Sequence, residues 1–246
     1  MTFRQNHEPQ SFNDLIFHDP AVEQVLREYA DGHRTKHLIL HGPKGSGKSC
    51  AAQMILKSRL PHNFPDATTS PINGRTDRNR KDWEIIWSNW NAQISNGCRG
   101  YTHLDEIDRY NLKQLDMLDE FLEHDRLGTL VMTTNHLENL DEWITDRCTL
   151  VEVLRPTGSD MIDRAHAILQ AEGYSYDRQQ VGSMLSGFQG SLRKMVEALE
   201  NYVLKHPPNA AASSSVAQSK TPSGALTTTT LQPKKTQHLT VGGKTV

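Results

Sequence analysis

A glycine-rich loop that ends in a lysine and a serine carries the clearest chemical signal in the sequence. Residues 42–49 read GPKGSGKS and match the pattern G-x-x-x-x-G-K-[ST]. Glycines let backbone N–H groups approach phosphate oxygens, and the helix that follows points its positive end at them. Lys48 would reach the β- and γ-phosphates of a nucleotide, and Ser49 would hold Mg²⁺. We therefore expect ATP to be bound by Gly42, Pro43, Lys44, Gly45, Ser46, Gly47, Lys48 and Ser49.

Two adjacent carboxylates follow a short apolar run and form a second candidate site. The run 101–104 ends in Leu104 and is followed by Asp105 and Glu106. One carboxylate there can hold Mg²⁺ through water, and the next can polarise an attacking water molecule. We assign Asp105 to the metal and Glu106 to the general base. Acidic pairs also occur in ordinary solvated turns, and it is the phosphate-loop pattern that favours catalysis here.

Alternating strands and helices would position these side chains. Apolar runs bounded by turn residues predict strands at 37–41, 70–73, 101–104, 129–134 and 149–153. Helical periodicity predicts helices at 20–31, 48–60, 82–95 and 111–124. Strands that alternate with helices form parallel sheets covered by helices. We therefore expect the α/β fold of a P-loop NTPase, with a parallel five-stranded sheet flanked by helices.

The pattern changes after Pro156, and the chain divides into three parts. Residues 1–156 should form the nucleotide-binding α/β domain, and 157–206 a small bundle of three helices. Residues 207–246 are rich in Ser and Thr and contain four lysines but no Asp or Glu. Such a segment cannot bury enough apolar surface to fold, so we expect a disordered basic tail. The net charge of −2 leaves the other residues acidic overall.

The remaining composition excludes several other classes of protein. The three cysteines are far apart and form no C-x-x-C pair, which argues against a disulfide framework or a cysteine-bound zinc. No H-E-x-x-H or G-x-S-x-G pattern occurs, so we expect no protease or nuclease activity. No apolar stretch is long enough to span a membrane, and we expect a cytoplasmic protein without a membrane partner.

Taken in order, these motifs resemble those of AAA+ ATPases of the clamp-loader branch. The chain is similar to replication factor C small subunits over about residues 10–205. The similar segments occur along the chain in the same order as in that family. They are the adenine-pocket segment 12–16 (FNDLI), the loop 73–78 (NGRTDR), the Walker B box 104–108 (LDEID), the sensor 1 segment 133–135 (TTN), the arginine motif 146–148 (DRC) and the sensor 2 box 190–194 (GSLRK).

The resemblance implies roles for three further residues. Asn135 would orient the attacking water or touch the γ-phosphate, Arg147 would enter the ATP site of a neighbouring subunit, and Arg193 would contact phosphate from a helical lid domain at 157–206. The sequence departs from the family where Asp146 replaces a serine and Lys44 replaces a proline. We also expect the chain to lack the C-terminal collar domain of clamp-loader subunits.

The same resemblance implies cofactors and partners. ATP and Mg²⁺ are the expected cofactors, and Lys48, Glu106, Asn135 and Arg147 the expected catalytic residues. The expected partners are AAA+ neighbours in a homo- or hetero-oligomer, and a sliding clamp or other replication protein. A basic cluster could bind DNA or be a solvated loop: Arg75, Arg78, Arg80 and Lys81. The alternatives are a helicase loader, a transposition-type DNA-binding ATPase, or a protein remodeller that binds no nucleic acid.

Overall fold

The computed structural model describes residues 2–60, 72–73, 80–188 and 190–206, apart from the side chains of residues 73 and 80–82. Three expectations therefore lie outside the described residues: the disordered tail 207–246, the absence of a collar, and the basic cluster. Arg75 and Arg78 fall in the gap between the described residues 72–73 and 80–188. Arg80 and Lys81 begin a helix, but their side chains are not described. No helix in the described ranges is long and apolar enough to cross a membrane.

A parallel sheet forms the centre of the α/β part. Its strands are β1 (His37–His41), β2 (Ile72–Asn73), β3 (Gly100–Asp105), β4 (Gly128–Thr134) and β5 (Cys148–Glu152), in the spatial order β2-β3-β4-β1-β5. All the pairings are parallel. The α/β class with a parallel sheet is confirmed. The strand expected at 70–73 is only the two-residue strand β2, which pairs with β3 at the edge of the sheet. The body of the sheet therefore has four strands.

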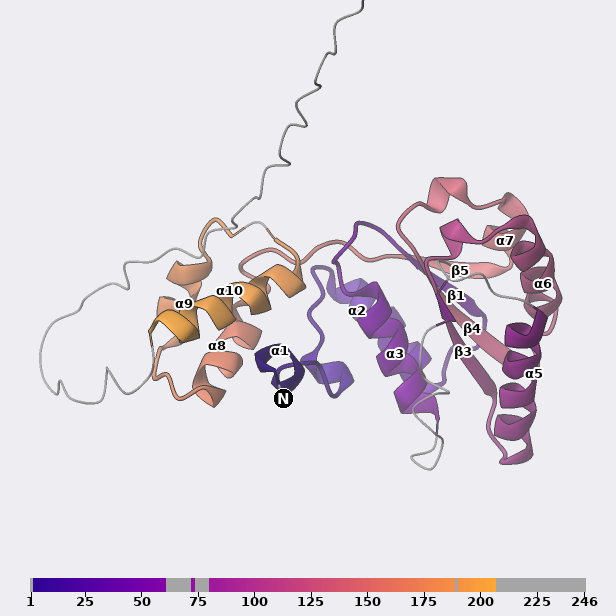
Figure 1. Ribbon diagram of the computed structural model, residues 1–246, viewed down its shortest axis with the longest axis horizontal. Helices are drawn as coiled ribbons and strands as arrows, with labels where there is room; N and C mark the ends of the chain where they lie inside the picture. The colour runs from indigo at the N-terminus through magenta and orange to yellow at the C-terminus, as the bar shows by residue number, and fades with distance from the viewer. Residues whose placement is uncertain (1, 61–71, 74–79, 189, 207–246) are drawn as a thin grey trace, which may run out of the picture.

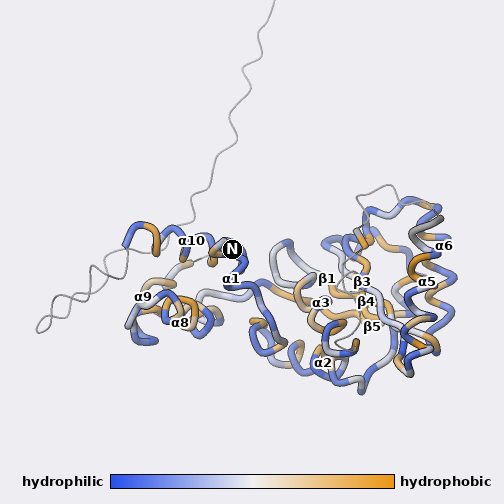
Figure 2. The backbone as a smooth tube through the Cα atoms, turned by 60° about the horizontal axis from the view of Figure 1, so that its bottom comes forward, coloured by the Kyte–Doolittle hydropathy of each residue, from blue (hydrophilic) through white to orange (hydrophobic). Residues whose placement is uncertain are grey.

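Helices cover both faces of this sheet (Figure 1). On one face lie α2 (Pro20–Asp31) and α3 (Lys48–Arg59), whose apolar side chains share a core with β1 and β5. On the other lie α5 (Arg80–Ser95) and α6 (Leu112–Leu122), with α7 (Glu142–Asp146) near the end of α6. Apolar positions, drawn in orange, gather in the sheet, while the helices carry blue positions as well (Figure 2). Strands covered on both faces are expected to be apolar throughout.

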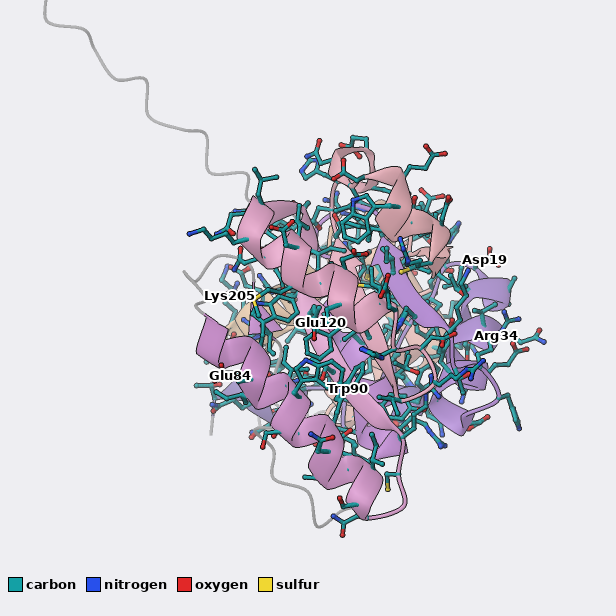
Figure 3. The ribbon with its side chains drawn as sticks, turned by 90° about the vertical axis from the view of Figure 1, so that its right-hand side faces the viewer. Asp19, Arg34, Glu84, Trp90, Glu120 and Lys205 are labelled. Carbon is teal, nitrogen blue, oxygen red and sulfur yellow. The ribbon has the colours of Figure 1, made fainter. Side chains whose placement is uncertain are left out.

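Local sequence explains where these helices begin and end. The Asp19 carboxylate accepts the Ala21 N–H at 2.8 Å and Pro20 opens α2, which is the cap predicted from the sequence. Asn111 caps α6 with a reciprocal bond to Gln114. In α5 the periodic apolar positions Trp83 and Trp90 are buried against the sheet. Figure 3 looks onto this layer from outside, with Glu84 on α5 and Glu120 on α6.

Three helices follow the sheet and enclose a core of their own. They are α8 (Ile162–Ala171), α9 (Arg178–Leu185) and α10 (Leu192–Lys205). Met161, Leu169, Met184 and Leu199 are among the fully buried members of this core. The short helix α1 (Phe3–Asn6) lies beside α10, because Phe3 packs into the same core (Figure 1).

The segment before α2 bridges the two cores. Phe12, Leu15 and Phe17 pack against the α2–α3 side of the sheet, whereas Phe3 and Ile16 pack on the core of α8–α10. An ion pair and two histidine–carboxylate hydrogen bonds tie the same segment to α8 and its flanks: Arg164–Asp14 at 3.0 Å, His7–Glu172 at 2.7 Å and His18–Asp160 at 2.8 Å. Residues 2–18 therefore form a second connection between the sheet and the helices, besides the linker that follows β5.

Candidate functional site

The loop 42–47 connects β1 to α3 and is shaped by two crowded glycines. Gly42 follows β1, and a Cβ atom on it would lie 2.6 Å from the Val153 carbonyl oxygen. Gly45 has φ +83°, and a Cβ atom there would lie 2.5 Å from Cβ of Ser191. Neither position could hold a side chain without displacing its neighbours. The loop therefore lies tightly between the end of β5 and the start of α10.

Lys48 lies at the centre of the site, at the first turn of α3. Its side chain is buried, and its ammonium donates to the carbonyl oxygens of Gly42 at 2.8 Å and Pro43 at 2.9 Å. It also donates to Oδ1 of Asn135 at 3.0 Å. Burial lowers the pKa of Lys48 to about 8, although nearby carboxylates oppose this effect. The ammonium is still mostly protonated at pH 7, so it can pair with phosphate.

Ser49 and Asp105 meet at the ends of their elements, as the sequence predicts. Ser49 Oγ donates to Asp105 Oδ1 at 2.8 Å, and the Thr133 hydroxyl on the neighbouring strand β4 donates to the same oxygen. Hydroxyl and carboxylate oxygens are the ligands that Mg²⁺ prefers. This donor set has the chemistry that a magnesium ion requires.

Glu106 adopts a backbone conformation that is unusual for a glutamate. Its φ is +54°, and it is the only described residue other than glycine with positive φ. Its N–H donates to Thr133 Oγ1 at 3.2 Å, and its carboxylate lies 3.3 Å from Arg109 Nε. The carboxylate is mostly shielded from solvent, at 14% exposed. Sequence reasoning found Glu106 but missed Arg109, its ion-pair partner on the same turn.

The strand register brings Asn135 to the same edge of the sheet. Leu40 and His41 of β1 pair with Thr133 and Thr134 of β4, so the residue after Thr134 lies near the start of the phosphate loop. The Thr134 hydroxyl is fixed by a bond to Asp108 at 2.8 Å. The contact between Asn135 and Lys48 follows from this register. The amide that the sequence proposed for sensing phosphate is therefore within hydrogen-bond distance of the phosphate-loop lysine.

Arg147 lies elsewhere, at the end of α7. Its guanidinium donates to the Trp143 carbonyl at 3.0 Å and lies 3.8 Å from Asp119 and 4.0 Å from Glu123, both on α6 or just after it. These contacts are with α6 and α7, and none of them is with the phosphate loop. The side chain is 39% exposed. The structure thus leaves Arg147 at the surface, separate from the residues around Lys48.

Arg193 lies in the first turn of α10, next to the phosphate loop. Ser191 caps this helix and is the residue that crowds Gly45, while Leu192 lies 3.5 Å from the Cβ position of Gly47. Arg193 itself is exposed. The contacts of Ser191 and Leu192 therefore bring the start of α10, and with it Arg193, to the loop.

His103 is the polar residue in the centre of β3 that the sequence left without a role. It is fully buried, and neither ring nitrogen has a hydrogen-bond partner among the described residues. Burial lowers the pKa of His103 to about 4, against the attraction of Asp105. The ring is therefore neutral at pH 7 and packs in the sheet as an uncharged side chain.

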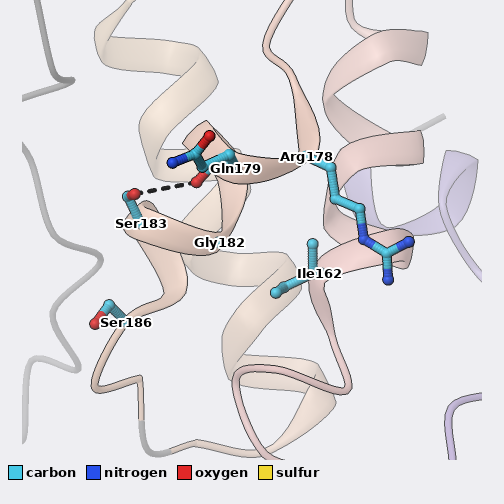
Figure 4. A pocket seen from close by; sticks show the side chains of 6 residues that line it. All are labelled: Ile162, Arg178, Gln179, Gly182, Ser183 and Ser186. Atoms are coloured by element: carbon cyan, nitrogen blue, oxygen red, sulfur yellow. Dashed lines mark hydrogen bonds between the residues drawn. The ribbon is translucent and has the colours of Figure 1, made fainter.

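A shallow pocket of about 630 Å³ lies on the helical part. It is lined by residues of α8, α9 and the turn that follows α9: Ile162, Arg178, Gln179, Gly182, Ser183 and Ser186 (Figure 4). Arg178, its charged member, is paired with Asp163 at 3.0 Å. The described residues hold no cluster of three or more His, Cys, Asp or Glu that could bind a metal.

Comparison with known proteins places the chain among relatives of replication factor C. The large subunit of Pyrococcus abyssi is 24% identical over 204 residues, covering 81% of this chain and 41% of that protein. The small subunit of Aeropyrum pernix is 22% identical over 205 residues, covering 81% of this chain and 62% of its own length. The chain thus spans only part of the length of these relatives. No family model matches the chain.

Solved structures show the same fold at low identity. A mutant of RuvB from Thermotoga maritima superposes with a TM-score of 0.60 and 19% identity, covering 80% of this chain and 67% of that one. The chain therefore has the fold of AAA+ P-loop NTPases, and its homologues at 19–24% identity over about 80% of its length are replication factor C subunits. The recognition drawn from the sequence motifs is confirmed at this level.

Proposed function

We propose that this chain, which has the AAA+ fold and replication factor C homologues, hydrolyses ATP and couples the nucleotide to assembly on DNA in clamp-loader fashion. The observation that carries the proposal is the convergence of four predicted residues at one edge of the sheet. Lys48 contacts Asn135 at 3.0 Å, and Ser49 contacts Asp105 at 2.8 Å. These residues come from α3, β3 and the end of β4, so their meeting is a property of the fold.

Each of these residues has a task that follows from its position. The N–H groups of the loop 42–49 and the Lys48 ammonium would bind the β- and γ-phosphates. Ser49 and Asp105 would hold Mg²⁺, which neutralises charge on the phosphates when bound. Glu106 would accept a proton from the attacking water, and Asn135 would orient that water. To accept that proton, the Glu106 carboxylate would have to contact the attacking water in place of the Arg109 guanidinium.

Arg147 would complete the site of a neighbouring chain. It is exposed at the surface and lies apart from the Lys48 site of its own chain. A guanidinium supplied across a subunit junction compensates charge in the transition state, an effect of about 10³- to 10⁵-fold for arginine fingers. Arg193 would contact phosphate from the helical lid formed by residues 157–206. ATP would then be held between two chains, which explains how the nucleotide controls assembly.

A mixing experiment tests the trans role of Arg147. We expect Arg147→Ala to lower hydrolysis by about 10³-fold or more while leaving ATP affinity close to that of the original protein. The matched control is Arg178→Ala, which removes an exposed arginine of the lid. Mixing Arg147→Ala with Lys48→Ala should restore hydrolysis, because the second chain supplies Arg147 to the intact site of the first. Arg147→Ala with undiminished turnover would remove the residue from catalysis.

The nucleic-acid part of the proposal has a separate test. ATPase rate and particle size are measured with primed DNA, with a sliding clamp, and with both together. Clamp-loader action predicts the largest stimulation when both are present. Stimulation by any duplex without a clamp would instead favour helicase loading or transposition-type binding, and stimulation by protein alone would favour a remodeller. Binding of Mg²⁺-ATP is required by all of these outcomes.

A further inference from the structure

The residues just after β5 lie along the phosphate loop. The Val153 N–H donates to the His41 carbonyl at 2.8 Å, and the Val153 carbonyl oxygen is the atom that crowds Gly42. Two residues later, Arg155 Nε donates to the Lys44 carbonyl at 3.0 Å. Val153 and Arg155 therefore both contact the start of the phosphate loop, although the loop lies more than 100 residues earlier in the sequence.

We propose that Arg155 is a positioning residue that fixes the Lys44–Gly45 peptide of the phosphate loop for nucleotide binding. In a trans peptide the C=O and the following N–H point in opposite directions. A bond that holds the Lys44 carbonyl toward Arg155 therefore turns the Gly45 N–H the other way, toward the phosphate side of the loop. The inference rests on the proposed function, since it concerns the same nucleotide site.

The contacts of the neighbouring carbonyls support this assignment. Lys48 holds the carbonyls of Gly42 and Pro43, so three consecutive carbonyls of the loop are bonded to cationic side chains. Lys48 must give up its two carbonyls when it pairs with phosphate, whereas Arg155 can keep its bond. Gly45, with φ +83°, adopts a left-handed conformation that glycine reaches without steric cost, so its own residue type does little to fix the peptide before it. Arg155 is placed to supply that restraint.

Electrostatics add to the effect. The charge of Arg155 is among the smaller influences that lower the pKa of Lys48, so the two cations are near enough to interact. Both raise the positive potential of the loop, which attracts phosphate. Arg155 contacts the loop at the Lys44 carbonyl oxygen. It would therefore act on the nucleotide through the loop.

Arg155 also connects the loop to the lid. It is followed by buried Pro156, whose ring restricts the backbone, and by Thr157, whose N–H bonds Asp160 at 2.7 Å just before α8. A Cβ atom on Gly158 would lie 2.6 Å from the Leu185 carbonyl, so the linker is seated against the lid. A movement of the lid would therefore shift Arg155 and, through Lys44, the loop.

The test compares ATP and ADP affinities of Arg155→Ala, Arg155→Lys and the lid control Arg178→Ala by titration with Mg²⁺ present. Arg155→Ala should weaken ATP and ADP alike, by about five- to tenfold, since one charge-assisted hydrogen bond is lost and both nucleotides use the loop. Arg155→Lys should recover part of the affinity, because an ammonium can still donate to the carbonyl. Turnover at saturating ATP is measured in the same variants and should fall less than the affinities do, because Arg155 acts on binding through the loop.

Three outcomes would overturn the inference. Unchanged affinities in Arg155→Ala would remove the positioning role. A loss confined to ATP would point to direct contact with the γ-phosphate, and a loss accompanied by a lower melting temperature would point to a general structural role. These outcomes differ from failure of the proposed function, which would appear as an original protein unable to bind Mg²⁺-ATP at all.

Discussion

The carboxylate of Glu106, proposed above as the general base, is restrained by both its backbone and its side chain. Its position after β3 puts it beside Asp105, and its strained backbone is held by Thr133. Strained conformations of this kind cost about 1–3 kcal/mol and persist where the surrounding structure determines them. The ion pair with Arg109 fixes the side chain as well. This turn is therefore built to hold one particular carboxylate at one particular place.

We expect Glu106→Gln to lower ATP hydrolysis by about 10²- to 10⁴-fold without weakening ATP binding. The amide has the shape of the carboxylate but cannot accept the proton of the attacking water. The assay measures single-turnover hydrolysis alongside nucleotide affinity, and Glu197→Gln on the exposed face of α10 serves as the charge-matched control. A Glu106→Gln protein that hydrolyses ATP as fast as the control would exclude Glu106 as the base.

A second residue-scale prediction concerns His37, at the start of β1. Burial lowers its pKa from 6.5 to about 4, and its Nδ1 accepts the Leu130 N–H at 3.0 Å. The unfolded chain therefore binds this proton at higher pH than the folded chain does. The contribution of His37 to stability is complete above pH 6.5 and is lost as the pH falls toward 4, by up to about 1.4 kcal/mol per pH unit.

The measurement is the free energy of unfolding in urea at pH 7, 6 and 5. His37→Asn keeps an acceptor for Leu130 but does not titrate, so its stability should fall less steeply with acid than that of the original protein. Exposed His33→Asn is the control and should leave the slope unchanged. Equal slopes in all three proteins would show that His37 is not held neutral by the fold.

Residues of the site were predictable where a local motif encodes them. The phosphate-loop pattern predicts Lys48 and Ser49 directly, and it is that pattern which favours a catalytic role for Asp105 and Glu106 over an ordinary acidic turn. Arg109 and Arg155 were not found, because an arginine has no local signature and its role depends on what it meets. For Arg155 that partner is a carbonyl 111 residues away in sequence.

At the scale of elements, the end of the sheet opposite the phosphate loop is held together by Arg99. Its guanidinium donates to the carbonyls of Gly128 at 2.8 Å, Arg126 at 3.0 Å and Thr35 at 3.2 Å, and Nε donates to the Thr129 hydroxyl at 2.9 Å. These residues precede or begin β1 and β4, while Arg99 itself precedes β3. One side chain thus joins the starts of three neighbouring strands.

We expect Arg99→Met to lower the free energy of unfolding by about 2–3 kcal/mol, because several charge-assisted bonds are lost while the apolar stem is retained. ATP affinity should be unchanged, since the substitution lies at the far end of the sheet from Lys48. Urea denaturation and nucleotide titration measure the two effects separately. A loss below about 0.5 kcal/mol, the range of ordinary surface substitutions, would contradict the bridging role.

Strands and helices were predictable from periodicity, but their arrangement was not. The apolar runs of β1, β3, β4 and β5 have lengths and boundaries close to those predicted. The order β2-β3-β4-β1-β5 places β1 between β4 and β5, and no local pattern specifies that neighbour choice. The extent of β2 was also uncertain from sequence, because the proline-rich stretch before it has no clear period.

At the scale of the whole molecule, residues 2–18 should restrict the lid. Deleting them removes the Arg164–Asp14 and His7–Glu172 contacts and leaves the lid connected to the sheet by the linker after β5 and by the packing of Ser191 and Leu192 on the phosphate loop. We expect the amides of α8–α10 in the deleted protein to tumble faster than those of the sheet, measured by NMR relaxation. The full-length chain should show one correlation time for both. Identical tumbling in the two proteins would contradict the role of this segment.

α1 packs beside α10, and the N-terminus lies near the start of that helix (Figure 2). Phe3 and Val203 pack on the same core, so a linker long enough to run along α10 could join the two ends of the described residues. New termini could then be opened at the turn around Gly97, which has open space around it. The elements could therefore be connected in a different order along the chain while they keep the same packing. This molecule is suited to circular permutation.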